Sequence, residues 1–179
     1  MNRRLAQGMQ GVRRAEPHEP VRAVVALGAN LGDRAETIRE AITDLARLPL
    51  TDDVVAAEPI ESVALTPEGR DASAPAYLNS VALLQTRLAP TVLLSYLHAI
   101  EAKHGRQRQV GARWQDRTLD LDLIAYGEVQ TSGPGLVLPH PRAAERDFVL
   151  APWLVLDPDA ELPGAGRVDE LLARVRAAS

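Results

Sequence analysis

Two aspartates that could bind a metal ion lie two residues apart in the run Leu119-Asp-Leu-Asp-Leu123. Leucines alternate with Asp120 and Asp122, which is the period of a strand with one face in the core. The two carboxylates therefore share the other face, with Ile124 and Tyr126 expected beside them. Like charges held this close repel each other, and magnesium, which prefers carboxylate oxygens, would relieve the repulsion. The pair indicates a magnesium site, although solvation or a salt bridge to arginine would also satisfy it.

Four arginines precede this pair within twelve residues: Arg106, Arg108, Arg113 and Arg117. The planar guanidinium group matches phosphate oxygens through paired hydrogen bonds, so this cluster favours a polyphosphate ligand. The chain has no G-x-x-x-x-G-K-[ST] loop, so metal ions and arginines would have to hold any nucleotide phosphates. Trp114 could stack on a flat ring or anchor the core with about equal probability.

Two further groups carry weaker signals. Prolines flank His140 and fix the backbone that aims its side chain, although a histidine in a turn is more often structural. Tyr77 and Asn79 are two apart on one expected strand face, and an amide suits the edge of a heterocycle. Asparagine near a strand edge more often contacts backbone, so neither signal stands alone.

Composition limits the possible classes of function. The 179 residues predict a single domain over 21–179, preceded by a disordered tail over 1–20. A net charge of -4 argues against nucleic acid or an acidic membrane as a partner, and the absence of cysteine excludes thiolate metal sites. The chain shows no apolar run of membrane-spanning length and no secretory signal, so we expect a cytoplasmic protein.

The periodicity predicts strand, helix, strand, strand, helix, strand. The expected strands are 21–27, 53–62, 77–86 and the aspartate strand, with a turn over 28–33 and an exposed mobile loop over 65–75. Asp33 would cap a helix running to about 48, and a second helix would run from Pro90 to Gly105. The apolar stripe of that second helix is Val92, Leu93, Tyr96, Leu97 and Ile100. This order is the ferredoxin-like βαββαβ pattern of an α+β fold, with helices on one face of an antiparallel sheet and C-terminal additions.

Five segments in order resemble the 6-hydroxymethyl-7,8-dihydropterin pyrophosphokinases of folate synthesis. They are Val25-Ala-Leu-Gly-Ala-Asn-Leu-Gly-Asp33, Ala76-Tyr-Leu-Asn-Ser80, Gly105-Arg-Gln-Arg108, Arg113-Trp-Gln-Asp-Arg-Thr-Leu-Asp-Leu-Asp122 and Leu138-Pro-His-Pro-Arg142. The resemblance covers about 21–163 and implies a ferredoxin-like fold. It also implies transfer of diphosphate from ATP to the pterin, with release of AMP.

The resemblance also implies roles for individual residues. Asp120 and Asp122 would hold two magnesium ions, and Arg106 and Arg117 would contact the phosphates and assist transfer. The nucleotide site would be lined by Glu101, Arg108, Arg117, Leu123, His140 and Arg146. The pterin would be bound by Tyr77, Asn79, Trp114 and Phe148. The chain departs from the family where Ser62-Val-Ala64 replaces a common Thr-Pro-Pro, beside the expected pterin site.

Two other functions stay open at this point. Another two-metal phosphoryl enzyme, such as a nucleotidyltransferase, would release pyrophosphate or form a nucleotide-linked product. A regulatory module of ferredoxin-like fold would bind ATP without turnover, although binding alone rarely needs two adjacent carboxylates. For the enzyme we expect ATP and the pterin as partners, and a monomer.

Overall fold

The computed structural model describes residues 19–66, 69–71, 75–105 and 118–178. Most of the predicted tail lies outside these residues. So do five predicted site residues, namely Arg106, Arg108, Arg113, Trp114 and Arg117. Their expected roles therefore remain predictions.

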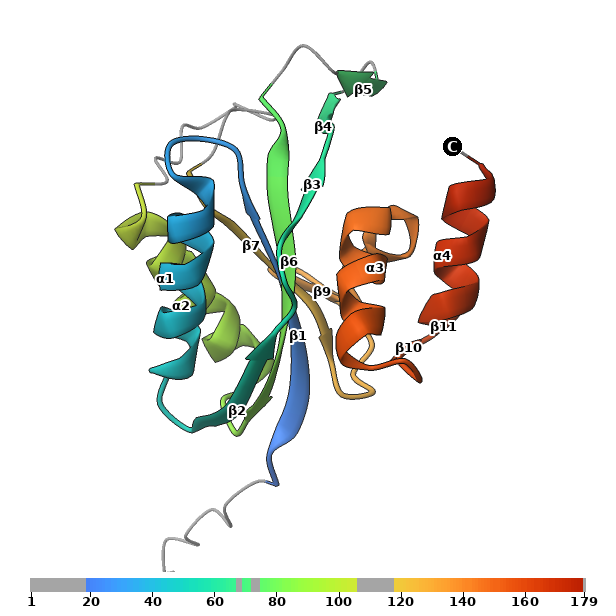
Figure 1. Cartoon of the computed structure of the whole chain (residues 1–179). Coiled ribbons are helices and arrows are strands. Elements are labelled where there is room, and N and C mark those ends of the chain that lie inside the picture. Colours follow the sequence, from blue (N-terminus) through green and yellow to red (C-terminus); the bar gives the residue numbers. More distant parts are fainter. Residues whose placement is uncertain (1–18, 67–68, 72–74, 106–117, 179) are drawn as a thin grey trace, which may run out of the picture.

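A five-stranded antiparallel sheet forms the centre of the molecule (Figure 1). Its strands are β1 (Val21–Ala29), β2 (Thr51–Ala56), β3 (Ile60–Ser62), β6 (Tyr77–Thr86) and β7 (Asp120–Tyr126). The order is β2-β6-β1-β7, and β3 pairs with β6 beyond the end of β2. The predicted strand over 53–62 is thus split in two. If β2 and β3 are counted together as one edge strand, the sheet has the ferredoxin-like strand order. The predicted fold is therefore confirmed.

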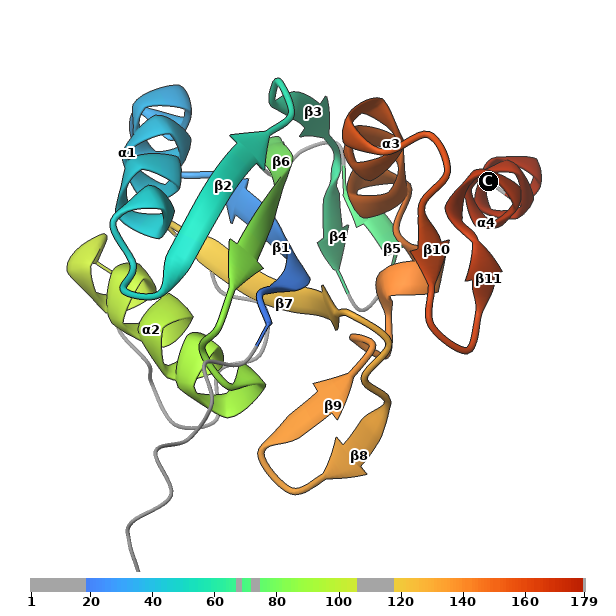
Figure 2. The same cartoon turned by 90° about the horizontal axis from the view of Figure 1, so that it is seen from below.

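Helices cover both faces of the sheet (Figures 1 and 2). One face carries α1 (Arg34–Ala46) and α2 (Pro90–Lys103), while the other carries α3 (Asp147–Leu156) and α4 (Val168–Ala177). The first pair was expected on one face. The C-terminal addition supplies the second layer, because the other face of the sheet is also apolar along most of its length.

Two hydrophobic cores follow from this three-layer arrangement. Between the sheet and α1 and α2, the largest fully buried side chains include Leu27, Ile38, Leu45, Leu84, Leu93, Leu97 and Leu119. Between the sheet and α3 and α4, buried side chains include Val24, Val81, Ile124, Leu150, Trp153 and Leu171.

The helix starts and stops follow the sequence. Asp33 caps α1, where its side chain accepts a hydrogen bond from the Glu36 backbone N–H at 3.0 Å.

The apolar stripe of α2 is narrower than predicted. Leu93, Leu97 and Ile100 are buried, whereas Val92 and Tyr96 are 44% and 36% exposed, because α2 crosses the sheet along a single i, i+4, i+7 line.

One strand face was predicted wrongly. Ile124 lies in the core under α3 and α4, as expected of the aspartate face, but Tyr126 packs in the opposite core with the leucines. The register between β1 and β7 shifts between Val24 and Val25. The shift is a bulge in β7, where Ile124 is the extra residue. Beyond it, the side chains of β7 point to the opposite faces from those that strict alternation predicts.

The remaining strands form three short hairpins. They are β4 (Ala64–Thr66) with β5 (Gly69–Asp71), β8 (Thr131–Gly133) with β9 (Leu136–Leu138), and β10 (Glu161–Leu162) with β11 (Gly166–Arg167). The first stands where an irregular loop was predicted. A 3-10 turn, Ala143–Glu145, precedes α3. Among the described residues, no helix is both long and apolar enough to cross a membrane.

Candidate active site

The aspartate pair lies at the first residues of β7. Asp120 is paired across the sheet with Gly28 of β1, and Asp122 is paired with Ala26. Both aspartates are half-buried, whereas Leu121 and Leu123 between and after them are buried in the core under α1 and α2. The prediction that the two carboxylates share one face is therefore confirmed.

A cationic side chain from the C-terminal layer reaches this pair. Arg146, which directly precedes α3, donates through Nη1 to Asp122 Oδ2 at 3.0 Å. The two side chains are 21% and 30% exposed, so solvent still screens the ion pair. The Arg146 guanidinium carbon also lies 5.8 Å from the centre of the Phe148 ring. Arg146 and Phe148, predicted at the nucleotide and pterin sites, are thus neighbours, and Arg146 lies beside one of the two predicted metal-binding carboxylates.

His140 faces the same carboxylate from the turn after β9. Its backbone N–H donates to Ile124 O at 2.8 Å, which places the residue beside β7. Nδ1 accepts from the Arg142 backbone N–H at 3.2 Å, so the ring proton lies on Nε2, 3.8 Å from Asp122 Oδ2. Burial lowers the pKa of His140; Asp122 opposes this shift and Arg146 adds to it. A neutral imidazole with an Nε2–H donor therefore faces the aspartates.

A row of residues crosses the sheet from the aspartates to the predicted pterin residues. Gly28 is paired with Asp120 on one side and with Asn79 on the other, so these residues share a face. Tyr77 lies two residues before Asn79 on the same face of β6. The sequence predicted a turn from Gly28 onward, but the structure includes Gly28 in β1. The glycine carries no side chain between the two predicted subsites.

Two predicted nucleotide-binding residues have buried side chains. Glu101 of α2 is fully buried and accepts the Leu121 backbone N–H at 2.8 Å. Its carboxylate holds the aspartate strand against α2, and its expected role in lining the nucleotide site stays a prediction. Leu123 is 4% exposed on the core face, so its backbone is the part that could contact a ligand.

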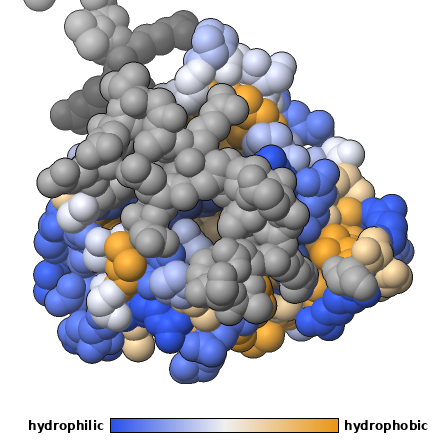
Figure 3. Space-filling view, turned by 90° about the horizontal axis from the view of Figure 1, so that it is seen from above, coloured by the Kyte–Doolittle hydropathy of each residue, from blue (hydrophilic) through white to orange (hydrophobic). Residues whose placement is uncertain are grey.

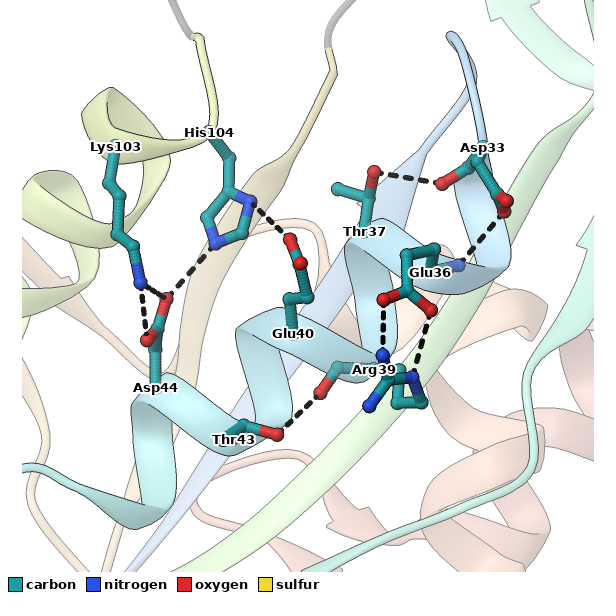
Figure 4. Close-up of polar contacts among 9 residues, drawn as sticks. All are labelled: Asp33, Glu36, Thr37, Arg39, Glu40, Thr43, Asp44, Lys103 and His104. Atoms are coloured by element: carbon teal, nitrogen blue, oxygen red, sulfur yellow. Dashed lines mark hydrogen bonds and ion pairs between the residues drawn. The ribbon is translucent and has the colours of Figure 1, made fainter.

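A polar cluster joins α1 to the end of α2 (Figure 4). Asp44 accepts from Lys103 Nζ at 2.7 and 2.8 Å and lies 3.0 Å from His104 Nε2. Burial alone would raise the pKa of Asp44, but the hydrogen bonds from Lys103 and His104 lower it overall. Next along the chain, a Cβ added to Gly105 would lie 3.7 Å from Thr118 Oγ1. The two ends of the described chain on either side of 106–117 therefore meet at this cluster.

The donor set fits a magnesium ion that arrives with a phosphate ligand. Asp120 and Asp122 supply carboxylate oxygens on one face. Among the described residues, no group of three His, Cys, Asp or Glu side chains is arranged to hold a metal ion. Magnesium is commonly held by one or two carboxylates, with the remaining positions filled by water and substrate phosphates. Two carboxylates therefore suit a metal shared with a nucleotide better than a permanently bound ion.

The surface at this end of the molecule is mixed in character. Figure 3 looks onto the end at which β4 and β5 lie in Figure 1, and its described rim is mainly hydrophilic with smaller hydrophobic areas. The sequence predicted the aspartates, His140, Arg146 and Asn79 as site residues. It assigned no role to the side chain of Ser62, which accepts a hydrogen bond from Asn79 Nδ2, because a lone strand serine carries no distinctive signal.

Comparison with known proteins places the chain. The model of the 7,8-dihydro-6-hydroxymethylpterin-pyrophosphokinase (HPPK) family matches residues 24–158. A curated 2-amino-4-hydroxy-6-hydroxymethyldihydropteridine pyrophosphokinase of Pseudomonas aeruginosa is 44% identical over 153 residues, covering 85% of this chain and 90% of that protein. The enzyme of the same name from Haemophilus influenzae is 34% identical over 152 residues, covering 85% and 91%.

A solved HPPK-DHPS structure in complex with substrates matches at a TM-score of 0.64 with 10% identity, covering 89% of this chain. The Plasmodium falciparum HPPK-DHPS with pteroate matches at 0.62 with 12% identity and the same coverage. This chain spans 44% and 43% of those longer chains, and at such low identity the likeness concerns the fold alone. The sequence matches decide the family: the chain belongs to the 7,8-dihydro-6-hydroxymethylpterin-pyrophosphokinases.

Proposed function

We propose that this protein transfers diphosphate from ATP to 6-hydroxymethyl-7,8-dihydropterin in folate synthesis. The observation that carries the proposal is the row across the sheet in which Gly28 separates Asp120 from Asn79. In this row, the carboxylate pair that we propose to bind metal lies beside an amide suited to the pterin edge. Family membership supports the same activity.

The reaction is an in-line displacement. The hydroxymethyl oxygen attacks the β-phosphorus, the bond from that phosphorus to the α,β-bridging oxygen breaks, and AMP leaves while the hydroxyl proton is released. Such a transfer depends on positioning and charge neutralisation more than on a strong base. Magnesium held by Asp120 and Asp122, two ions in our proposal, would neutralise the phosphates and lower the pKa of the attacking hydroxyl.

The cationic residues would then contact the phosphates. The Arg146 guanidinium, 3.0 Å from Asp122, would contact a phosphate oxygen once a metal ion neutralised that carboxylate. The Nε2–H of His140 faces the same space, and its neutral imidazole can donate one hydrogen bond. Arg106, Arg108 and Arg117 would complete the phosphate contacts in this proposal.

The pterin would lie over Gly28 with its edge on Asn79. The amide offers both a donor and an acceptor, which matches the amide-like edge of a pterin. Tyr77, Phe148 and Trp114 would contact the ring in this proposal. Glu101 would act indirectly by holding β7 through the Leu121 N–H. We expect the enzyme to work as a cytoplasmic monomer.

One assay separates this activity from its rivals. The protein is incubated with magnesium, ATP and the hydroxymethyl pterin, and the nucleotide products are separated by chromatography. AMP with a diphosphorylated pterin supports the proposal. Pyrophosphate release would indicate a nucleotidyltransferase, and ATP binding without any product would indicate a regulatory module; either result contradicts the proposal.

A further inference from the structure

The Asn79 carboxamide is held by a residue to whose side chain the sequence assigned no role. Asn79 Nδ2 donates to Ser62 Oγ at 2.7 Å. Asn79 is only 5% exposed, so this hydrogen bond is made away from bulk water and is correspondingly stronger. Ser62 is the last residue of β3 and pairs with Tyr77. The serine therefore lies on the strand next to the one that carries both predicted pterin residues.

The opposite end of the amide faces β1. A Cβ built on Gly28 would lie 3.4 Å from Asn79 Oδ1 and 3.8 Å from the Tyr77 ring carbon Cδ1. The carboxamide thus extends from Ser62 at the sheet edge to the position above Gly28. Ser62 uses one of the two N–H donors of the amide, so the second N–H and the oxygen are available to a ligand.

The strand that carries Ser62 is braced from the opposite face. Arg34, the first residue of α1, donates through Nη1 to the Ala76 carbonyl at 2.6 Å and through Nη2 to Glu61 Oε1 at 2.9 Å. Glu61 directly precedes Ser62, and Ala76 directly precedes Tyr77. The Arg34 side chain therefore links the end of β3 to the start of β6, which fixes the position of the Ser62 hydroxyl.

We propose that Ser62 is a positioning residue for the pterin, acting through Asn79. It holds the carboxamide in a single orientation before the ligand arrives, so binding does not have to order that side chain. The inference rests on the proposed function and deepens it.

The test compares Ser62→Ala with Ser62→Thr, which keeps a hydroxyl and suits a strand. Ser95→Ala is the matched control, because Ser95 Oγ donates to the Thr91 carbonyl on the exposed side of α2. Calorimetry measures binding of 6-hydroxymethylpterin to the magnesium-loaded complex with α,β-methylene-ATP. The carbon bridge of this analogue prevents transfer. Steady-state kinetics give the KM of each substrate, and thermal unfolding reports on folding.

Ser62→Ala should weaken pterin binding roughly tenfold, as expected for losing one largely buried hydrogen bond. The affinity for the nucleotide analogue should stay within about twofold, since Ser62 does not contact the aspartate pair. Ser62→Thr should restore most of the pterin affinity, and Ser95→Ala should match the wild type.

Three results would overturn the inference alone. They are wild-type pterin affinity in Ser62→Ala, an equal loss of affinity for both ligands, and failure of Ser62→Thr to restore binding in a folded protein. The second and third would indicate a general structural role. If the wild-type protein itself binds no pterin, the proposed function fails and the inference fails with it.

Discussion

The sharpest prediction concerns Asp122→Asn, which keeps the shape of the side chain and removes its charge. Asp122 is the carboxylate that both Arg146 and His140 face, at 3.0 and 3.8 Å. Loss of a metal ligand at a transferring phosphoryl group removes several kcal/mol of transition-state stabilisation. A loss of about 4 kcal/mol would slow diphosphate transfer roughly 1,000-fold.

The same substitution should leave the fold almost unchanged. The Asp122–Arg146 pair is partly exposed, and such pairs contribute about 1 kcal/mol or less. Removing one of two adjacent like charges acts in the opposite direction. We therefore expect the free energy of unfolding to change by no more than about 1 kcal/mol, which separates a catalytic defect from misfolding.

The assay measures AMP release at saturating magnesium, ATP and pterin, alongside urea unfolding of the same preparation. Asp52→Asn is the matched control: Asp52 is also a strand aspartate facing an arginine, with Arg87 Nη2 at 3.5 Å, but it lies on β2 away from the site. The control should keep full activity. A rate for Asp122→Asn within tenfold of the wild type would refute the metal-binding role, and so would an activity loss fully explained by unfolding.

Three further predictions concern stability. Glu101→Ala should lower the free energy of unfolding in urea by about 2–4 kcal/mol, because it leaves a cavity and removes the acceptor of the Leu121 N–H. Glu101→Gln should lower it less. Equal losses in the two variants would contradict this interpretation. Within the described structure, Trp153 Nε1 is a buried donor with no hydrogen-bond acceptor. Trp153→Phe should therefore change the free energy of unfolding by less than about 1.5 kcal/mol, whereas Trp153→Ala should lower it by about 3–5 kcal/mol. A large loss in Trp153→Phe would indicate that the Nε1–H is hydrogen-bonded. Asp44 has a folded-state pKa below its ordinary value of 3.8, so its contribution to stability is present above that value and is lost as pH falls through the lowered pKa. Asp44→Asn should flatten the acid side of the stability profile, and an unchanged profile would show that its contacts with Lys103 and His104 contribute nothing.

Local patterns in the sequence predicted much of this molecule. The alternation of leucine and aspartate correctly placed Asp120 and Asp122 on one face, because the side-chain period of a strand does not depend on what packs against it. Asp33 and Pro90 marked helix starts through capping chemistry that is equally local. The order of these elements was sufficient to predict the ferredoxin-like sheet.

The structure corrected the sequence where long-range pairing decides. No local pattern marks the β7 bulge at Ile124, opposite Val24 and Val25, that carries Tyr126 to the other core. The same is true of Glu101, whose helical spacing does not show that its carboxylate is buried against β7. Each depends on contact between segments that are distant in the chain.

The sequence by itself therefore determined which chemical groups are present and which strand face they occupy, since both depend only on neighbouring residues. Only the tertiary structure decided their partners. Sheet register brings Gly28 between Asp120 and Asn79, and the α3 layer brings Arg146 to Asp122. The physical reason is that hydrogen-bond register and side-chain packing join residues dozens of positions apart, and one residue of slip would move every side chain to the other face.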